Sequence, residues 1–222
     1  QVATANKSTN WTVIGGLGGL GVLFLAAMMY LAVKPPATPE SFSLTDYCND
    51  NPNVCVSMGD ENAPVTILEV SDFGCPHCRN FNADTAPLLE QQYVDAGIVR
   101  YVSVPFSLGP TTLIGASSAM CANEQDAYFE YQTALFANTD NDNFLTPEGV
   151  VETAVEIGLD EAAFDACVSS GKYASTIQNN VNAAQKSGVS ATPTFFINDL
   201  KVEGNNPLQN FATYIAQAQQ GG

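Results

Sequence analysis

The sequence predicts an α/β domain in which a long helical segment interrupts a core of strands and helices. A run of β-branched and apolar residues at 65–70 predicts a buried strand. Directly after it comes Cys75-Pro-His-Cys78, followed by apolar residues at helical spacing. A second group of strand signals, at 195–197 and 200–203, lies near the other end of the chain. Because helical patterns fill most of the chain between the two groups, we expect one core divided by a helical insertion.

The first half of the core is expected to contain three strands and one long helix. Strands are predicted at about 54–58, 64–70 and 98–105 from their β-branched and apolar composition. The helix that begins at the two cysteines should occupy about 75–96. Pro87 should kink this helix, because proline cannot donate the backbone hydrogen bond that a helix interior requires.

The insertion is expected at about 107–171, and the remaining core elements follow it. Thr146, which precedes a proline, and Asp160, which precedes a glutamate, are both typical of helix starts. Asn198-Asp199 predicts a hairpin turn between the two late strands. A closing helix is predicted at 207–219.

The N-terminal part contains a stretch of 23 residues without a charge, at 11–33. Since about 20 apolar residues span the hydrocarbon core of a bilayer, this stretch predicts one transmembrane helix. It would follow a short tail at 1–10 and precede a linker at 34–53 that contains Cys48. The alternative is a cleaved signal peptide, but its apolar core is normally only about 7–15 residues long and ends at a small-x-small cleavage site. The longer stretch and the lack of a good site favour an uncleaved anchor.

The orientation and the packing of this anchor can also be read from its residues. Lys7 and Lys34 balance each other, so the distribution of basic residues does not decide which end is cytoplasmic. Six cysteines in a chain of this size indicate an oxidising compartment, which places residues 35–222 outside the cytoplasm and the N-terminus inside it. Gly15 and Gly19 form a G-x-x-x-G pair, which permits close contact with a partner helix in the membrane.

The charge of the chain argues against nucleic acid as a partner. The formal net charge is −16, with only 7 lysine and arginine residues against 23 acidic ones. Residues 1–34 contain no acid, so the negative charge lies entirely on residues 35–222. Binding to phosphates depends on clustered lysine and arginine, which this part of the chain lacks.

Cys75 and Cys78 favour redox chemistry over metal binding or a purely structural role. A structural zinc site needs four ligands, usually a second Cys-x-x-Cys pair or two histidines. No second pair exists, and His77 is the only histidine in the chain, so we expect no metal. A purely structural disulfide is also disfavoured, because so short a loop constrains little of the unfolded chain. The site needs no organic cofactor, since the cysteine pair itself would carry the electrons.

Each residue of the motif has an expected role in thiol–disulfide exchange. Cys75 would stand at a helix N-terminus, where unpaired backbone N–H groups and the helix dipole lower the pKa of a thiol. Pro76 is tolerated in the first helical turn, and His77 adds a second donor or positive charge beside the sulfur. Each feature stabilises the reduced thiolate form and makes the disulfide more oxidising. Cys78, further into the helix, should be the buried resolving thiol.

Two motifs together resemble the DsbA family of thioredoxin-fold thiol oxidoreductases. Phe73-Gly-Cys-Pro-His-Cys78, preceded by Asn62-Ala-Pro-Val-Thr-Ile67, is similar to the active-site region of that family. Gly188-Val-Ser-Ala-Thr-Pro-Thr-Phe-Phe-Ile197 resembles its cis-proline loop and the strand that follows. The similarity extends from about residue 56 to the C-terminus, so 54–222 is expected to be a DsbA-like thioredoxin domain.

The resemblance implies further site residues and a partner. Thr192-Pro193 should be a cis peptide against the active-site sulfurs, with the Thr192 backbone offering strand-like hydrogen bonds to a bound peptide. Glu69 stands where such enzymes often carry a buried acid that can accept the proton of Cys78. The alternative for Glu69 is a strand residue that faces solvent, but its apolar neighbours favour burial. Reoxidation would require a quinone-linked membrane oxidase of the DsbB or vitamin-K-epoxide-reductase (VKOR) type.

The remaining four cysteines allow three pairings. Cys48–Cys55 with Cys121–Cys167 is the solution in which both bridges are local. The second of these bridges would tie two helices of the insertion, as in a subset of the DsbA family. Free buried thiols are the alternative for each cysteine, and the even count disfavours them.

The function predicted from these observations is a membrane-anchored, extracytoplasmic thiol:disulfide oxidoreductase. It would donate the Cys75–Cys78 disulfide to reduced or unfolded secreted or membrane proteins. One rival keeps the fold but reverses the electron flow, as a reductase or isomerase. Another is a structural or assembly subunit of a membrane complex with a secondary redox role, for which the glycine-rich anchor is the sequence support. The redox potential of the cysteine pair distinguishes the first rival, and co-purification distinguishes the second.

Overall fold

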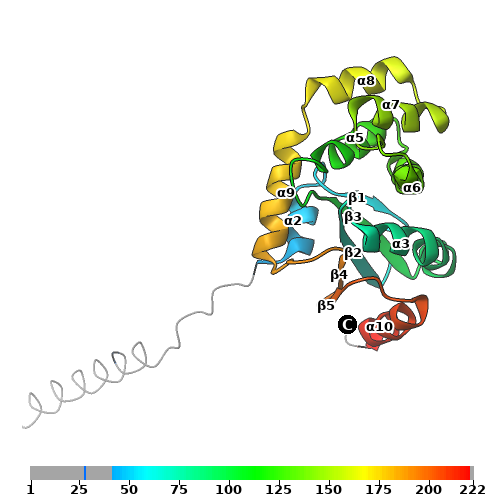
Figure 1. Cartoon of the computed structure of the whole chain (residues 1–222). Coiled ribbons are helices and arrows are strands. Elements are labelled where there is room, and N and C mark those ends of the chain that lie inside the picture. The colour runs from blue at the N-terminus through cyan, green and yellow to red at the C-terminus, as the bar shows by residue number, and fades with distance from the viewer. Residues whose placement is uncertain (1–27, 29–41, 221–222) are drawn as a thin grey trace, which may run out of the picture. The chain divides into compact units, whose positions relative to one another are not determined.

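The computed structural model describes Met28 and residues 42–220 (Figure 1). The predicted transmembrane helix at 11–33 therefore lies outside the described residues apart from Met28, and so do Gly15 and Gly19. In the part of the chain that the structure describes, no helix is both long enough and apolar enough to cross a membrane.

Five strands of the described domain form one mixed sheet in the order β1-β3-β2-β4-β5. The two central strands, β2 (Val65–Ser71) and β3 (Val99–Pro105), pair in parallel. The other three strands, β1 (Val56–Met58), β4 (Thr194–Ile197) and β5 (Leu200–Glu203), all pair antiparallel with their neighbours. This arrangement confirms the predicted strands and the hairpin across Asn198-Asp199. It also confirms that segments from both ends of the described domain meet in one core.

One face of the sheet is covered by the helices that begin at the cysteine motif and by the last helix. The predicted helix at 75–96 is divided into α3 (Pro76–Asp84), α4 (Ala86–Leu89) and a π-helical turn (Glu90–Val94). The break falls just before Pro87, whose ring nitrogen has no hydrogen to donate, so the kink predicted there is a separation of two helices. The closing helix is α10 (Leu208–Gln220). The buried apolar side chains between this helical layer and the sheet include Val65, Ile67, Phe81, Leu89, Phe195, Phe211 and Ile215.

The opposite face is covered by α2 (Leu44–Asp50) and α9 (Ala174–Lys186), so the predicted linker at 34–53 contains a helix at 44–50. The Ser43 side chain caps α2 by accepting a hydrogen bond from the Asp46 backbone N–H at 3.1 Å. The second layer of the core contains Leu44, Cys48, Leu68, Val70, Val102, Val104, Ala183 and Ala184. Residues 44–50 therefore belong to the domain, because one face of this short helix is buried against the sheet.

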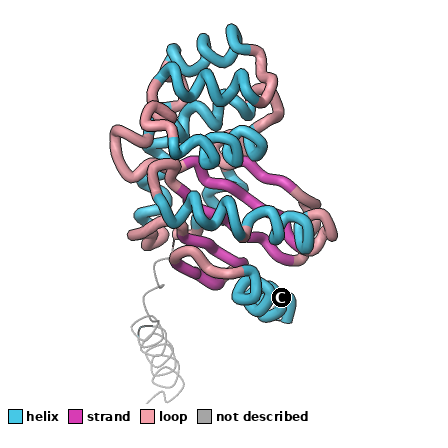
Figure 2. The backbone as a smooth tube through the Cα atoms, turned by 45° about the vertical axis from the view of Figure 1, so that its right-hand side comes forward, coloured by secondary structure: helices cyan, strands magenta, loops and turns pink. Residues whose placement is uncertain are grey.

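The insertion lies at one end of the sheet and consists of helices, as predicted for about 107–171 (Figures 1 and 2). Its helices are α5 (Leu113–Asn123), α6 (Tyr128–Ala137), α7 (Pro147–Glu156) and α8 (Glu161–Ser170), with a 3-10 turn (Asn138–Asp140) after α6. These helices share a core of their own, which also includes Phe73 and Cys78 from the motif region. The insertion is therefore packed directly against the two cysteines.

The two predicted helix starts in the insertion are confirmed. The side chain of Thr146 accepts from the Gly149 backbone N–H, and that of Asp160 accepts from the Ala163 backbone N–H. Each cap satisfies one of the N–H groups that a helix leaves without a partner at its start.

Candidate active site

Cys75 and Cys78 occupy very different environments within a single helical turn. Cys75 is the N-cap residue of α3, with an extended backbone and a half-buried side chain, and Pro76 follows in the first turn. The Cys78 side chain lies one turn further in and is 0% exposed. Both cysteines carry free thiols, so this is the reduced form. A thiol reagent or substrate can therefore reach Cys75 but not Cys78.

Asp72 holds the turn between β2 and the cysteines. One carboxylate oxygen accepts from the Gly74 backbone N–H at 2.8 Å. The other accepts from the Leu108 N–H and the Thr112 hydroxyl, both at 2.6 Å. Gly74 is required beside it, since a Cβ there would lie 2.5 Å from the Thr112 Cγ2 atom. The carboxylate thus fixes the motif to the start of the insertion, a role that the sequence analysis did not identify.

Thr192-Pro193 meets Cys75, although the two motifs are far apart in the chain. The peptide bond between Thr192 and Pro193 is cis. The Cys75 thiol donates a hydrogen bond to the Thr192 carbonyl oxygen at 3.3 Å across a separation of 117 residues. The expected contact between the proline loop and the active-site sulfur is therefore present in the fold.

The environment lowers the pKa of the Cys75 thiol to about 5. The largest cause is a hydrogen bond from the Cys78 thiol, which stabilises the Cys75 thiolate more than burial disfavours it. Thr192 and the backbone N–H groups of Cys78 and His77 lower the pKa further. The pKa of the Cys78 thiol is raised instead, because the thiol is buried and donates a hydrogen bond to Cys75. The pair therefore has one thiolate and one protected thiol at neutral pH.

His77 contributes a backbone N–H to the active site. The side chain is exposed, and its ring makes no hydrogen bond among the described residues, whereas the backbone N–H helps to lower the pKa of Cys75. The sequence predicted that the imidazole would act as a second donor or positive charge. The backbone N–H is a donor that any residue at this position of the helix N-terminus would provide, and the role of the imidazole stays a prediction.

Glu69 is completely buried on the sheet face that carries the cysteine helix. It is 0% exposed, and its strand neighbours are Ser103 on β3 and Phe195 on β4. One carboxylate oxygen accepts from the Tyr101 hydroxyl at 2.8 Å and from the Gln132 side-chain amide at 3.4 Å. Burial is the main cause that raises the pKa of Glu69, and these hydrogen bonds oppose it only in part. The alternative of a solvent-facing strand residue is excluded by this burial.

The low pKa of Cys75 predicts a pH dependence of the stability of the reduced protein. A thiol that ionises more readily in the folded than in the unfolded state stabilises the fold above the unfolded pKa of about 8.5. This contribution declines as the pH falls and is lost once the pH passes below the folded value of about 5. Urea unfolding of both forms between these pH limits should show that the unfolding free energy of the reduced form falls relative to that of the oxidised form as the pH decreases. A constant difference would contradict the low pKa.

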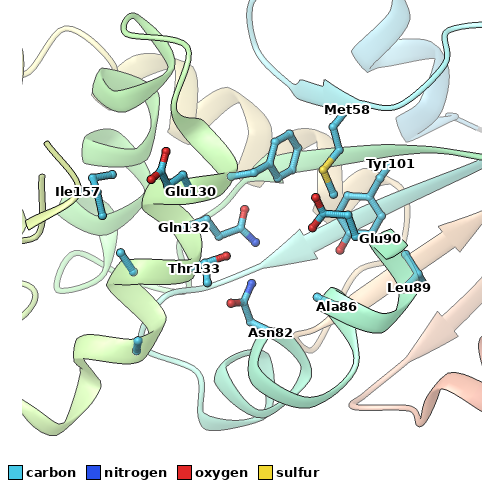
Figure 3. Close-up of a pocket in the computed structure, with 13 residues that line it drawn as sticks. Met58, Asn82, Ala86, Leu89, Glu90, Tyr101, Glu130, Gln132, Thr133 and Ile157 are labelled. Carbon is cyan, nitrogen blue, oxygen red and sulfur yellow. The ribbon is translucent and has the colours of Figure 1, made fainter. Parts of the chain in front are cut away.

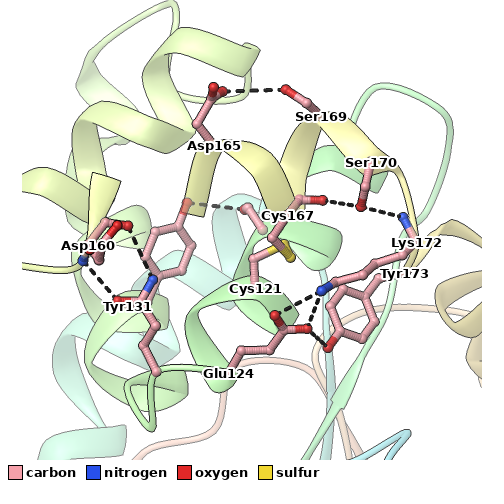
Figure 4. The surroundings of a disulfide bond; sticks show 12 residues. Cys121, Glu124, Tyr131, Asp160, Asp165, Cys167, Ser169, Ser170, Lys172 and Tyr173 are labelled. Carbon is pink, nitrogen blue, oxygen red and sulfur yellow. Dashed lines mark hydrogen bonds and ion pairs between the residues drawn. A yellow bond between two sulfur atoms is a disulfide. The ribbon is translucent and has the colours of Figure 1, made fainter. Parts of the chain in front are cut away.

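The remaining cysteines form two disulfides, Cys48–Cys55 and Cys121–Cys167. The first joins α2 to the approach to β1, and the second joins α5 to α8 (Figure 4). In the described part of the chain, no group of three or more histidine, cysteine or acidic side chains is placed to hold a metal ion.

Comparisons with known proteins agree with this geometry. Residues 51–217 match a protein family described as thioredoxin, so the chain belongs to the thioredoxin family. Within that family the described domain is a DsbA-like thiol:disulfide oxidoreductase.

Three relatives illustrate this placement. The chain is 28% identical over 163 residues to "Disulfide bond formation protein D" of Bacillus subtilis, and the match covers 71% of each protein. Its fold matches the crystal structure of Wolbachia pipientis alpha-DsbA1 with a TM-score of 0.68 and 27% identity, covering 74% of this chain and 90% of that one. It is also 32% identical over 163 residues to "Na(+)/H(+) antiporter NhaA 3" of Salinispora tropica. That match covers 72% of this chain but only 24% of the antiporter, so the chain spans about a quarter of that protein.

Proposed function

We propose that the chain donates its Cys75–Cys78 disulfide to reduced or unfolded proteins outside the cytoplasm. The main support is the opposite direction of the two pKa changes, which gives an accessible thiolate at Cys75 and a protected thiol at Cys78. Stabilising the thiolate favours the reduced enzyme, and a favoured reduced form makes the disulfide a stronger oxidant. The name of the Bacillus subtilis relative, a disulfide bond formation protein, supports the same direction of electron flow.

The reaction would proceed through a mixed disulfide at Cys75. A substrate thiolate attacks the Cys75 sulfur, and Cys78 leaves with the electron pair and takes up a proton. A second thiolate of the substrate then attacks the substrate sulfur that is bonded to Cys75. The substrate disulfide forms, and Cys75 leaves as a thiolate. Glu69 would exchange the proton with Cys78, and Thr192 and Pro193 would bind the substrate backbone beside the sulfur.

The compartment and the partners form a second part of the proposal. Two disulfides besides the redox pair support an oxidising environment. Residues 11–33 would anchor the domain to the outer side of a membrane, with the N-terminus in the cytoplasm, and Gly15 and Gly19 would allow contact with a partner helix. By resemblance to the DsbA family, a quinone-linked oxidase of the DsbB or VKOR type would restore the disulfide.

The redox potential of Cys75–Cys78 tests the direction of transfer. Equilibration with glutathione buffers and alkylation of free thiols should give a value closer to the about −120 mV of strong oxidants than to the about −270 mV of thioredoxin. The physical reason is the stabilised Cys75 thiolate. A potential near the thioredoxin value would favour the reductase or isomerase alternative.

A further inference from the structure

Glu69 has only part of the hydrogen bonding that a buried carboxyl group requires. The oxygen that faces Tyr101 and Gln132 is hydrogen-bonded, but the second oxygen, Oε1, has no partner among the protein atoms. None of the ion pairs in the described residues involves Glu69. An unpaired acceptor this deeply buried costs free energy unless water or a proton occupies it.

Ser71 lies near the buried acid and follows it in the same strand. It is two residues from Glu69 in β2, so its side chain projects from the same face of the sheet. Its hydroxyl oxygen is buried and has no geometrically defined partner. This hydroxyl nevertheless lowers the pKa of both Cys78 and Glu69. A hydroxyl can accept a proton on one side while it donates one on the other.

A pocket of about 480 Å³ lies between α3, α4 and α6 (Figure 3). Tyr101 and Gln132, the two side chains that donate hydrogen bonds to Glu69, also line this pocket. They are only 3% and 4% exposed, so they form its floor rather than its rim. In Figure 3, Gln132 from α6 and Asn82 from α3 point into the same space. The Gln132 carbonyl oxygen, like Glu69 Oε1, lacks a protein partner, and a pocket with several polar groups can hold water.

We propose that Tyr101 and Gln132 position Glu69 as the proton acceptor for Cys78, and that the pocket they line is the outlet through which this proton reaches solvent. The proposal rests on the proposed thiol–disulfide exchange, but it holds whether the cysteine pair oxidises or reduces its substrate.

The step concerns the resolution of a mixed disulfide at Cys75. The Cys78 thiol gives its proton through the Ser71 hydroxyl to the Glu69 carboxylate, and the resulting thiolate attacks the Cys75 sulfur. The Cys75–Cys78 bond forms, the bond from Cys75 to the partner sulfur breaks, and the partner leaves with the electron pair as a thiolate. Glu69 then releases the proton to water in the pocket.

The groups around Glu69 explain why hydrogen bonding controls its titration. The titratable groups that interact with it are Cys78 on α3, Tyr101 on β3 and Tyr128 on α6, and each is neutral when protonated. No cation among them stabilises the carboxylate. Only the hydrogen bonds from Tyr101 and Gln132 and the interaction with the Ser71 hydroxyl oppose the effect of burial. Loss of one of these donors should therefore raise the pKa of Glu69 further.

The test follows the resolving step in the full chain. Cys75 is first linked to glutathione, and the release of glutathione by Cys78 is then measured against pH by rapid quenching and mass spectrometry. Tyr101→Phe and Gln132→Leu should both move the midpoint of this profile to higher pH. At pH values below the midpoint, each variant should release glutathione about tenfold more slowly for every pH unit by which the midpoint has moved.

Tyr128→Phe is the matched control, because its hydroxyl contacts Ser103 at 2.9 Å and not Glu69. An unchanged midpoint in both folded variants would overturn the positioning role.

The outlet is tested separately by filling the pocket. Ala86 lines it, whereas Ala83 is exposed on α3 outside it, so Ala86→Phe and Ala83→Phe form a matched pair. The infrared band of the protonated Glu69 carboxyl group, identified by its loss in Glu69→Gln, reports hydrogen–deuterium exchange at this site. Exchange should slow in Ala86→Phe and not in Ala83→Phe. Equal exchange in both proteins would exclude the pocket as the outlet. Failure of the proposed function would appear instead in the redox potential, which neither of these tests measures.

Discussion

Cys78→Ala is expected to accumulate mixed disulfides with substrate proteins, whereas Cys75→Ala should trap none. The half-buried Cys75 stands at the start of α3 with its pKa lowered to about 5, so it is the sulfur that substrates can reach. Cys78 is fully buried and its pKa is raised, so it can resolve a mixed disulfide but cannot form one with an external protein. Without Cys78, the bond between Cys75 and the substrate has no internal nucleophile to break it.

Trapping is measured by gel electrophoresis without reductant after incubation with a reduced, unfolded substrate. The double variant Cys75→Ala with Cys78→Ala is the control, because it keeps the two structural disulfides and lacks only the redox pair. Equal amounts of mixed disulfide from the two single variants would mean that nucleophile and resolving thiol are wrongly assigned.

The core was predictable from sequence because its signals are local. Runs of β-branched and apolar residues mark the strands, and Thr146 and Asp160 act as caps through atoms only three residues away. The cysteine motif likewise defines its own helix start. Helix α2 was mistaken for linker, because a helix of 7 residues with two buried positions, Leu44 and Cys48, is too short to show a period.

The polar part of the site could not be predicted, because it depends on contacts between distant segments. Asp72 is an ordinary acid in the sequence, and its partners Leu108 and Thr112 lie 36 and 40 residues away. Tyr101 becomes a neighbour of Glu69 only through the pairing of β2 with β3, since it is two residues from the strand partner Ser103. Gln132 comes from the insertion, 63 residues from Glu69, and no spacing rule relates the two.

Removal of the Cys121–Cys167 disulfide is expected to have the largest effect on stability. The bridge closes a loop between two cysteines that are 46 residues apart in the sequence. In the chain-entropy model, the double variant Cys121→Ala with Cys167→Ala should lose about 4 kcal/mol of unfolding free energy. Whole domains are typically stable by about 5–15 kcal/mol, so this would be a large share. Urea unfolding of the oxidised proteins measures the difference.

Two control variants separate the disulfide from its surroundings. Glu124 at the end of α5 forms an ion pair with Lys172 at 2.6 Å beside the same bridge (Figure 4). Both side chains are substantially exposed, so Glu124→Gln should cost no more than about 1 kcal/mol. The Cys48–Cys55 bridge spans a separation of only 7 residues, and its removal should cost about 2.5 kcal/mol in the same entropy model.

The loss of the Cys121–Cys167 bridge should leave the redox pair nearly unchanged. The groups that lower the pKa of Cys75 belong to α3 and Thr192, and neither disulfide cysteine of α5 and α8 is among them. The redox potential and the Cys75 thiolate titration of the double variant should therefore match the wild type under conditions where both are folded. A large shift in either value would mean that the insertion helices control the active site through their packing on Phe73 and Cys78. A loss smaller than that of the Cys48–Cys55 variant would show that loop length does not determine the stabilisation in this fold.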